Sequence, residues 1–302
     1  MYPKNDIQLL KLLLTSTESA LLNVCGNYLI TKYGKHNVFA KKDFIYATGD
    51  IPILLVAHLD TVLSEKPHIW VTNNHTTWFG KDTGLGADDR AGVFAILKII
   101  QSGRRPSVLF TTGEEIGGFG AMAFVKEFAE PPVPTKYVIE IDRRGRGQAV
   151  FYDCGNTKFM KYVESFGFTT QRGIFSDISF ICPHWDVAGV NLSAGYYNEH
   201  TEFETLKTAD LFYTIDRVKK MLDNADEALF YDFEDLQKNK ISYTKCRICG
   251  KIIPYFTATT VDKMPVCLEC VNAFVDWCEV CGKPFLLGHE YQTMCEVCAN
   301  VV

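Results

Sequence analysis

Apolar runs of strand length recur through the first 235 residues, and helix-like segments separate them. The clearest runs are ILLVA at 53–57, SVLF at 107–110 and YVIEI at 137–141. A run that is apolar throughout is typical of a strand buried on both faces of a sheet. Strands that alternate with helices predict an α/β fold, with a mixed, largely parallel sheet flanked by helices.

The element boundaries follow from periodicity and from capping residues. Residues 5–33 have helical periodicity that is broken near Thr15–Thr17, where capping residues cluster. We expect a hairpin over 69–79, further helices at 88–102, 118–129, 156–166 and 208–230, and strands at 36–40, 43–48, 51–57, 107–112, 137–141 and 187–192. The polar, acidic segment 231–240 predicts a linker, which gives a catalytic domain over 1–235 and a second domain over 241–302.

Composition and charge exclude several classes of function. The net charge of -5 gives no electrostatic reason to expect nucleic acid or an anionic membrane as a partner. No apolar run approaches the roughly 18 residues that a membrane span requires. The first residues lack the basic start and long apolar stretch of a signal peptide. We therefore expect a cytoplasmic protein without a membrane or nucleic-acid partner.

Residues of metal-ligand type stand where several predicted strands end. His58 follows ILLVA, Glu115 follows SVLFTT, and Asp142 follows YVIEI. Asp88 begins a predicted helix in GLGADDRAG, and His200 lies in the loop SAGYYNEHTE. Because α/β folds place their sites at the carboxyl ends of strands, we expect these five side chains to meet. Carboxylates with imidazoles suit Zn²⁺ first, and Mn²⁺ or Co²⁺ as alternatives.

Each of these residues also has an ordinary structural explanation when it is taken alone. Asp88 could be an N-cap, the Glu114–Glu115 pair could be solvated, and Asp142 could pair with Arg143 or Arg144. The metal hypothesis depends on all five candidate ligands occurring in order at the ends of successive predicted strands. Neighbouring residues add to it, because Asp60 has the same facing as His58 and can accept the second imidazole N–H. Of the adjacent glutamates, one can ligate while the other accepts a proton from the attacking water.

The motifs HLDTV, LGADDRAG and TTGEEIGG resemble those of the di-zinc exopeptidase superfamily, which holds peptidase T and zinc aminopeptidases. The resemblance covers about residues 5–230. It implies that Asp88 bridges two metals, that Glu114 is the general base, and that Asp60 orients a ligand. The remaining ligands that it implies are His58, Glu115, Asp142 and His200. It also implies a cis peptide bond after Asp88.

The chain differs from members of the superfamily that it resembles in two places. Peptidase T-like enzymes insert a lid and dimerisation domain between the ligands that correspond to Asp142 and His200, and this spacing is too short for one. Other relatives insert a domain between the ligands that correspond to His58 and Asp88, and that segment is short as well. We therefore expect a minimal catalytic domain without a lid.

Cysteines gather in the last sixty residues as four CxxC pairs, which are Cys246/Cys249, Cys267/Cys270, Cys278/Cys281 and Cys295/Cys298. Four such pairs predict a zinc-ribbon-like domain with two structural zinc ions, each held by four thiolates. Sequential pairing, first with second and third with fourth, is preferred, and an interleaved cross-brace is the alternative. Eight free thiols are the remaining explanation. Acidic residues outnumber basic ones from Ile241 onward, so a protein partner is expected rather than nucleic acid.

These observations predict a metal-dependent exopeptidase, with an aminopeptidase acting on short peptides as the first choice. A water that bridges two zinc ions would attack the peptide carbonyl, and Glu114 would be its general base. An amidohydrolase or carboxypeptidase acting on N-acyl or peptidyl amino acids is an alternative, with Arg143 or Arg144 binding the substrate carboxylate. A non-catalytic adaptor that binds a protein through the cysteine-rich tail is the other alternative.

Overall fold

A computed structural model describes residues 5–72, 74–81, 83–152, 156–225, 231, 243–254, 257–261, 264–278, 280 and 283–287. The chain divides into two compact units, Met1–Asp235 and Leu236–Val302. The predicted linker therefore spans the division, and most of it lies outside the described residues. Each unit has its own hydrophobic core.

The main sheet of the first unit has eight strands in the order β1-β2-β6-β3-β7-β10-β8-β9. Strands β6, β3, β7 and β10 run parallel to one another in its centre. Strands β1 and β2 extend one edge in antiparallel fashion, and β8 joins β10 antiparallel at the other. The bounds are β1 (Val38–Ala40), β2 (Phe44–Ala47), β3 (Ile51–His58), β6 (Pro106–Thr111), β7 (Tyr137–Arg143), β8 (Gln148–Val150), β9 (Thr169–Gln171) and β10 (Gly189–Ser193). The predicted mixed, largely parallel sheet is confirmed.

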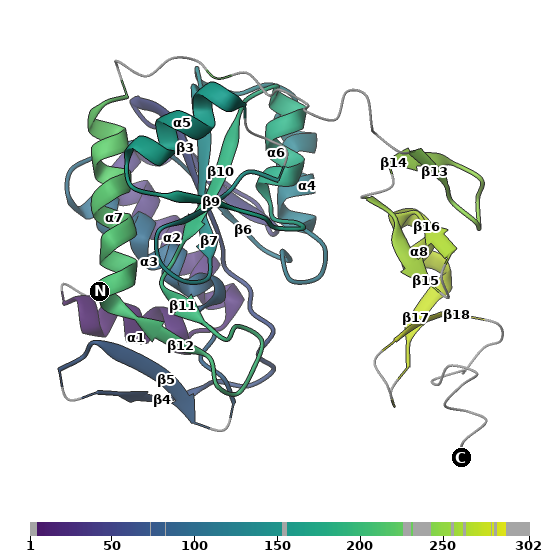
Figure 1. Ribbon diagram of the computed structural model, residues 1–302, viewed down its shortest axis with the longest axis horizontal. Coiled ribbons are helices and arrows are strands. Elements are labelled where there is room, and N and C mark those ends of the chain that lie inside the picture. The colour runs from purple at the N-terminus through teal and green to yellow at the C-terminus, as the bar shows by residue number, and fades with distance from the viewer. Residues whose placement is uncertain are drawn as a thin grey trace. The chain divides into compact units, whose positions relative to one another are not determined.

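Helices cover both faces of this sheet (Figure 1). One face packs against α1 (Asp6–Thr15), α2 (Glu18–Tyr33), α3 (Ala87–Gln101), α5 (Thr157–Ser165) and α7 (Thr208–Asp223). The other packs against α4 (Phe119–Glu127) and α6 (Ile178–Trp185). Strand β3 supplies Ile53 and Leu55 to the first core and Leu54 and Val56 to the second. This alternation explains why ILLVA is apolar without interruption.

Most predicted elements are confirmed, but some of them differ from the prediction and several short elements were not predicted. Helix α7 ends at Asp223, before the predicted end at 230, and residues 226–230 lie outside the described part. Strands β2 and β3 are consecutive in the chain but are not neighbours in the sheet, because β6 lies between them. Helix α6 was not predicted, since Pro183 interrupts its pattern, although the helix continues through that residue.

A second sheet has the order β11-β12-β5-β4. Its strands are β4 (His68–Val71), β5 (Thr77–Lys81), β11 (Tyr196–Tyr197) and β12 (Thr205–Lys207). The predicted hairpin over 69–79 provides β4 and β5, and Asn73 in its turn is outside the described residues. The connection between β11 and β12 carries His200, so this small sheet delivers one candidate ligand.

No inserted lid is found in the described segments between Asp142 and His200. Strands β8, β9 and β10 there join the main sheet, and α5 and α6 cover it. Between His58 and Asp88 the only described regular elements are β4 and β5. In the described part of the first unit, both segments are thus free of an inserted domain, and the catalytic role of this unit stays a prediction. Among the described residues, no helix is long and apolar enough to cross a bilayer.

In the part of the second unit that the structure describes, there are three short antiparallel pairs and one helix. The pairs are β13 (Tyr243–Lys245) with β14 (Ile252–Pro254), β15 (Thr259–Val261) with β16 (Met264–Val266), and β17 (Val275–Trp277) with β18 (Pro284–Leu286). The helix is α8 (Leu268–Phe274). A CxxC pair lies between β13 and β14, and another lies between β17 and β18. The first and third CxxC pairs therefore have the same place along the chain, each between the strands of an antiparallel pair.

Candidate metal centre

Three central strands bring four of the predicted site residues to one edge of the main sheet. Strands β6, β3 and β7 are parallel neighbours, so their carboxyl ends lie together. His58 is the last residue of β3, Asp142 lies at the end of β7, and Glu114 and Glu115 follow β6. His58 Nε2 is 3.6 Å from an Asp142 carboxylate oxygen. The predicted convergence at strand ends is therefore seen in the structure.

Asp88 lies between the two histidines. Its Oδ1 is 3.3 Å from His58 Nε2, and its Oδ2 is 3.2 Å from His200 Nε2. The peptide bond between Asp88 and Asp89 is cis, as the resemblance implied. Burial acts to raise the pKa of Asp88, but its contacts with His200 and His58 outweigh burial and lower it. One carboxylate thus presents a separate oxygen to each imidazole, which is the geometry of a bridging ligand.

His200 approaches from the loop between β11 and β12. His200 Nε2 lies 3.0 Å from Glu115 Oε2 and 3.2 Å from Asp88 Oδ2. The side chain is 48% exposed, whereas that of His58 is 1% exposed, so the site has an open side and a closed side. His200 has a φ of 62°, a left-handed conformation that is costly for a residue other than glycine. Such strained backbone is concentrated at functional sites.

Two three-residue groups share Asp88, namely His58–Asp88–Asp142 and Asp88–Glu115–His200. In each group the candidate ligand atoms lie within 4.8 Å of one another. Neither buried ring nitrogen of His58 makes a well-aligned hydrogen bond. A buried imidazole nitrogen that faces carboxylates without a hydrogen bond to them fits a metal ligand atom. The donor set of hard carboxylates and imidazoles therefore fits two divalent ions.

Asp60 lies behind His58. Its Oδ1 is 3.3 Å from His58 Nδ1, and its Oδ2 accepts the backbone N–H of Glu115 at 3.1 Å. Burial acts to raise the pKa of Asp60, but the His58 ring and this N–H group outweigh burial and lower it. An ionised Asp60 can keep the Nδ1 proton of His58 in place and leave Nε2 free for a metal.

Glu114 faces the same space without joining either three-residue group. One of its carboxylate oxygens is 4.0 Å from His58 Nε2, and its side chain is 12% exposed. Burial, with the charges of Asp142, Asp177 and Asp88, raises the pKa of Glu114 to about 9. Two bound cations would oppose this rise, since positive charge favours the ionised carboxylate. Its position suits a group that exchanges a proton with a reactant between the ligands.

Asp142 is held by residues that the sequence analysis did not single out. The side-chain oxygen of Asn191 accepts the Asp142 backbone N–H at 2.8 Å, and its amide donates to the Asp142 carbonyl at 2.9 Å. Tyr196 donates its hydroxyl to Asp142 Oδ1 at 3.0 Å. Asn191 is a polar residue inside the apolar run VAGVNL, and this interruption was the available signal.

Two more buried carboxylates lie close to Asp142 and Glu114. Glu140 accepts a hydrogen bond from Ser176, and Asp177 accepts one from Thr111. Burial raises the pKa of Glu140 well above its ordinary value and raises that of Asp177 to about 6. This side of the sheet therefore holds more acidic groups than its described cations can neutralise. Bound cations at the neighbouring ligands would relieve the repulsion.

Glu204 is a further buried acid near the site, with an exposed fraction of 2%. Its carboxylate accepts hydrogen bonds from four consecutive backbone N–H groups, those of 85–88. Sequence reasoning missed it, because these contacts join residues 116 to 119 positions apart. Only its place four residues after His200 could have drawn attention to it.

The two predicted substrate-binding arginines, Arg143 and Arg144, already have partners in the structure. Arg144 forms an ion pair of 2.8 Å with Glu199, and its side chain is 53% exposed. Arg143 donates to the Arg172 carbonyl at 3.4 Å. Arg144 therefore contacts Glu199, the residue that precedes His200. This ion pair would have to break before Arg144 could bind a substrate carboxylate.

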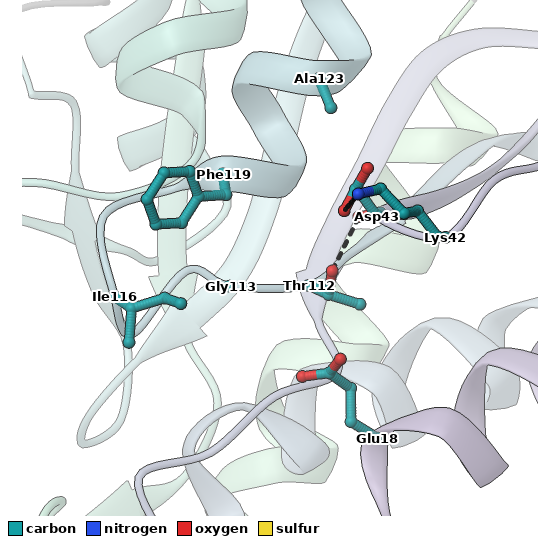
Figure 2. Close-up of a pocket in the computed structure, with 8 residues that line it drawn as sticks. All are labelled: Glu18, Lys42, Asp43, Thr112, Gly113, Ile116, Phe119 and Ala123. Carbon is teal, nitrogen blue, oxygen red and sulfur yellow. Dashed lines mark hydrogen bonds and ion pairs between the residues drawn. The ribbon is translucent and has the colours of Figure 1, made fainter. Parts of the chain in front are cut away.

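A pocket of about 490 Å³ borders the segment that leads into Glu114 (Figure 2). Ile116, Phe119 and Ala123 form its apolar lining, and Glu18, Lys42, Asp43, Thr112 and Gly113 complete it. Figure 2 shows Thr112 bonded to Asp43, whose carbonyl accepts the Thr112 hydroxyl at 3.1 Å. None of the five candidate ligands lines this pocket, so it adjoins the metal centre rather than containing it.

A separate cysteine cluster lies in the second unit. The thiols of Cys246, Cys249, Cys267 and Cys270 are free and lie within 4.8 Å of one another. Cys249 Sγ and Cys267 Sγ are 3.7 Å apart. Tetrahedral zinc with bonds of about 2.3 Å would separate its sulfurs by about 3.8 Å. The first and second CxxC pairs thus come together, as sequential pairing predicted. Cys278 is described, but Cys281, Cys295 and Cys298 lie outside the described residues, so the second cluster stays a prediction.

Residues 39–174 match the protein-family model described as Peptidase family M28. The matched segment contains His58, Asp88, Glu114, Glu115 and Asp142. It supports a peptide hydrolase and confirms the resemblance to zinc exopeptidases that the motifs carried. No curated protein sequence matches the chain significantly.

Solved structures with the same fold include three peptidases. Aminopeptidase PepT from Bacillus cereus is 16% identical, with a TM-score of 0.54, over 73% of this chain and 98% of that one. A tripeptidase from Staphylococcus aureus is 16% identical, with a TM-score of 0.56, over 74% and 99%. A TET aminopeptidase from a marine-sediment thaumarchaeote is 13% identical, with a TM-score of 0.58, over 74% and 99%. At these identities the likeness shows the fold.

Proposed function

We propose that the chain is a metal-dependent aminopeptidase that removes the N-terminal residue of short peptides. The observation that carries this proposal is Asp88, which presents one oxygen to His58 and the other to His200. Asp142 completes one group and Glu115 completes the other. Zinc is the first choice for both ions, and manganese and cobalt are alternatives with the same ligand types.

The two ions, when bound, would activate a water and polarise the peptide carbonyl. Glu114 would accept a proton from the attacking water and return it to the nitrogen of the cleaved peptide bond, which becomes the new amino end of the shortened peptide. Asp60 keeps the Nδ1–H of His58 in place, which fixes the ring orientation and the tautomer. Asn191 and Tyr196 hold Asp142 through its backbone and its carboxylate, so the closed side of the site is rigid.

The preference for the amino end of a short peptide is supported by the fold relatives. Two of the similar structures are named aminopeptidases and one is named a tripeptidase. The exposed side of the site, at His200, gives a substrate a way in, and no lid lies over the described part of it. We therefore expect short, flexible peptides to be better substrates than folded proteins.

A second candidate activity is hydrolysis of N-acyl or peptidyl amino acids from the carboxyl end. The observation that favours it is the position of Arg144, whose ion-pair partner Glu199 directly precedes His200. In this activity Arg144 or Arg143 would exchange its present partner for the substrate carboxylate through a bidentate contact.

We also propose that the second unit holds two structural zinc ions. Cys246, Cys249, Cys267 and Cys270 would bind one, and the other four paired cysteines the second. The short strands and small core of this unit make metal binding a main source of its folding free energy. A protein partner is the proposed role of its surface, where Phe274 and Trp277 are about half exposed.

The direct test uses a panel of peptides with free or acetylated amino ends and free or amidated carboxyl ends. Mass spectrometry would follow each product on protein loaded with zinc, manganese or cobalt. We expect loss of the N-terminal residue from every peptide with a free amino end, whether or not its carboxyl end is amidated. Cleavage that requires a free carboxyl end and tolerates acetylation would favour the second candidate. No cleavage by protein that holds both metals would favour a non-catalytic adaptor.

A further inference from the structure

We propose that Glu204 is a positioning residue that fixes the bridging carboxylate of Asp88 relative to the loop that carries His200. It would thereby set the affinity of the site formed by Asp88, Glu115 and His200 for its metal ion. This inference rests on the metal pair of the proposed function. It assigns a role to a residue that contacts neither ion and that no motif identified.

The two carboxylate oxygens of Glu204 each accept two hydrogen bonds from backbone N–H groups. Oε2 accepts the N–H groups of Leu85 at 3.0 Å and Gly86 at 2.6 Å. Oε1 accepts those of Ala87 at 2.8 Å and Asp88 at 3.0 Å. Four successive N–H groups that point at one carboxylate form an anion-binding concavity at the start of α3. The last of the four belongs to the bridging aspartate itself, so Glu204 holds the backbone from which that ligand extends.

The 84–88 segment is shaped to fit against the His200 loop. Gly84 and Gly86 have φ values of 71° and 70°, a conformation that glycine adopts without the strain of a side chain. A Cβ at Gly84 would lie 2.8 Å from the Thr201 carbonyl oxygen, one residue after His200. The two loops are therefore in close contact, and Glu204 joins them. A displacement of either loop would change the separation of Asp88 Oδ2 and His200 Nε2.

The charge of Glu204 matters in addition to its shape. Four backbone N–H groups converge on the Glu204 carboxylate, and N–H donors favour the ionised form of a carboxyl group. A neutral acceptor could also anchor part of the loop, but an ionised carboxylate adds negative charge beside Asp88. That charge attracts a cation to the adjoining ligands. Glu204 would thus contribute both geometry and electrostatic attraction, which a purely structural anchor would not.

The test compares Glu204→Gln with the matched control Glu202→Gln, an exposed glutamate in the same loop. In both variants a chelator would remove the ion pair of the first unit and leave the thiolate-bound ions in place. The emptied pair of sites would then be titrated with Co²⁺, with the visible absorption of the bound ion and its release to a chelator as readouts. Residues that orient metal ligands change affinity by roughly 10- to 100-fold when they are replaced. In Glu204→Gln we expect this loss of metal affinity for one ion of the pair and a smaller loss for the other. We also expect an altered absorption spectrum. Glu202→Gln should behave like the unaltered chain.

Unchanged affinities and an unchanged spectrum in a folded Glu204→Gln would overturn the inference. So would an equal loss for both ions without a spectral change, because that pattern indicates a general structural defect. If Glu204→Gln does not fold, Glu204→Asp decides, since it keeps the charge but is too short to reach all four N–H groups. Weaker binding of one ion by a folded Glu204→Asp supports the role, and affinity equal to that of the unaltered chain contradicts it. If the unaltered chain binds no metal pair, the proposed function itself fails, which is a distinguishable result.

Discussion

Glu114 is the residue on which the proposed chemistry depends most. It faces the ligand cluster but belongs to neither three-residue group, so its replacement should leave both ions bound. We predict that Glu114→Gln lowers kcat by at least about 100-fold, the usual scale for a general base. Metal analysis and peptide kinetics on the same preparation would check this, with the exposed Glu130→Gln as control. Loss of metal with unchanged turnover per bound ion would assign the base to another residue.

Sequence motifs identified the candidate metal ligands better than the residues that hold those ligands in place. His58, Asp88, Glu115, Asp142 and His200 stand in recognisable motifs, and the structure brings them together. Asn191 and Glu204 act through contacts with Asp142 and with the 85–88 segment, respectively, which are far away along the chain. Such pairs depend on how the strands and loops are arranged in space. Local patterns carry little information about that arrangement.

At the scale of elements, the metal centre depends on the close packing of α3 against β7. Gly92 in α3 makes this approach possible, because a Cβ there would lie 1.9 Å from the Ile141 carbonyl oxygen. The same atom would lie 2.5 Å and 2.6 Å from the carboxylate oxygens of Asp89. A side chain at this position would separate α3, whose first turn holds Asp88, from β7, whose carboxyl end holds Asp142.

We therefore predict that Gly92→Ala destabilises the protein by about 3 kcal/mol, at the upper end of the usual cost of overpacking. It should also weaken metal binding. Gly26 in α2 is the matched control, since a Cβ there would meet only Ile45 Cδ1 at 3.7 Å. Gly26→Ala should be neutral or stabilising by about 0.5–1 kcal/mol, as expected inside a helix. Urea unfolding of the two variants would check both values, and equal stability of the two would contradict the packing argument.

The elements that were predicted share strong periodicity or continuous apolar runs. Strands β3, β6 and β7 and helices α2 and α3 are of this kind. The missed elements are short or interrupted. Strand β11 has two residues, β8, β9 and β12 have three each, and α6 contains Pro183. Their structure comes from pairing with distant neighbours, such as β12 with β5, and this pairing leaves a weak local pattern.

At the scale of the whole molecule, the two units have separate cores and separate candidate metal sites. We predict that Cys246→Ser combined with Cys267→Ser removes one thiolate-bound ion and unfolds β13 and β14. The unfolding transition of the first unit should be unchanged, because its core is formed by residues up to Tyr231. Native mass spectrometry and circular dichroism would follow the two effects. A lower midpoint for the first unit would show that its stability depends on the tail.

The central claim is that one carboxylate, Asp88, is shared by two metal ions in the first unit. The most direct measurement is the metal content per chain of the full-length protein, compared with Asp88→Asn and with the exposed control Asp50→Asn. The account predicts four ions in the unaltered chain and in Asp50→Asn, two of them bound by thiolates. It predicts only the two thiolate-bound ions in Asp88→Asn. Four ions in Asp88→Asn, or only two in the fully loaded unaltered chain, would contradict the account.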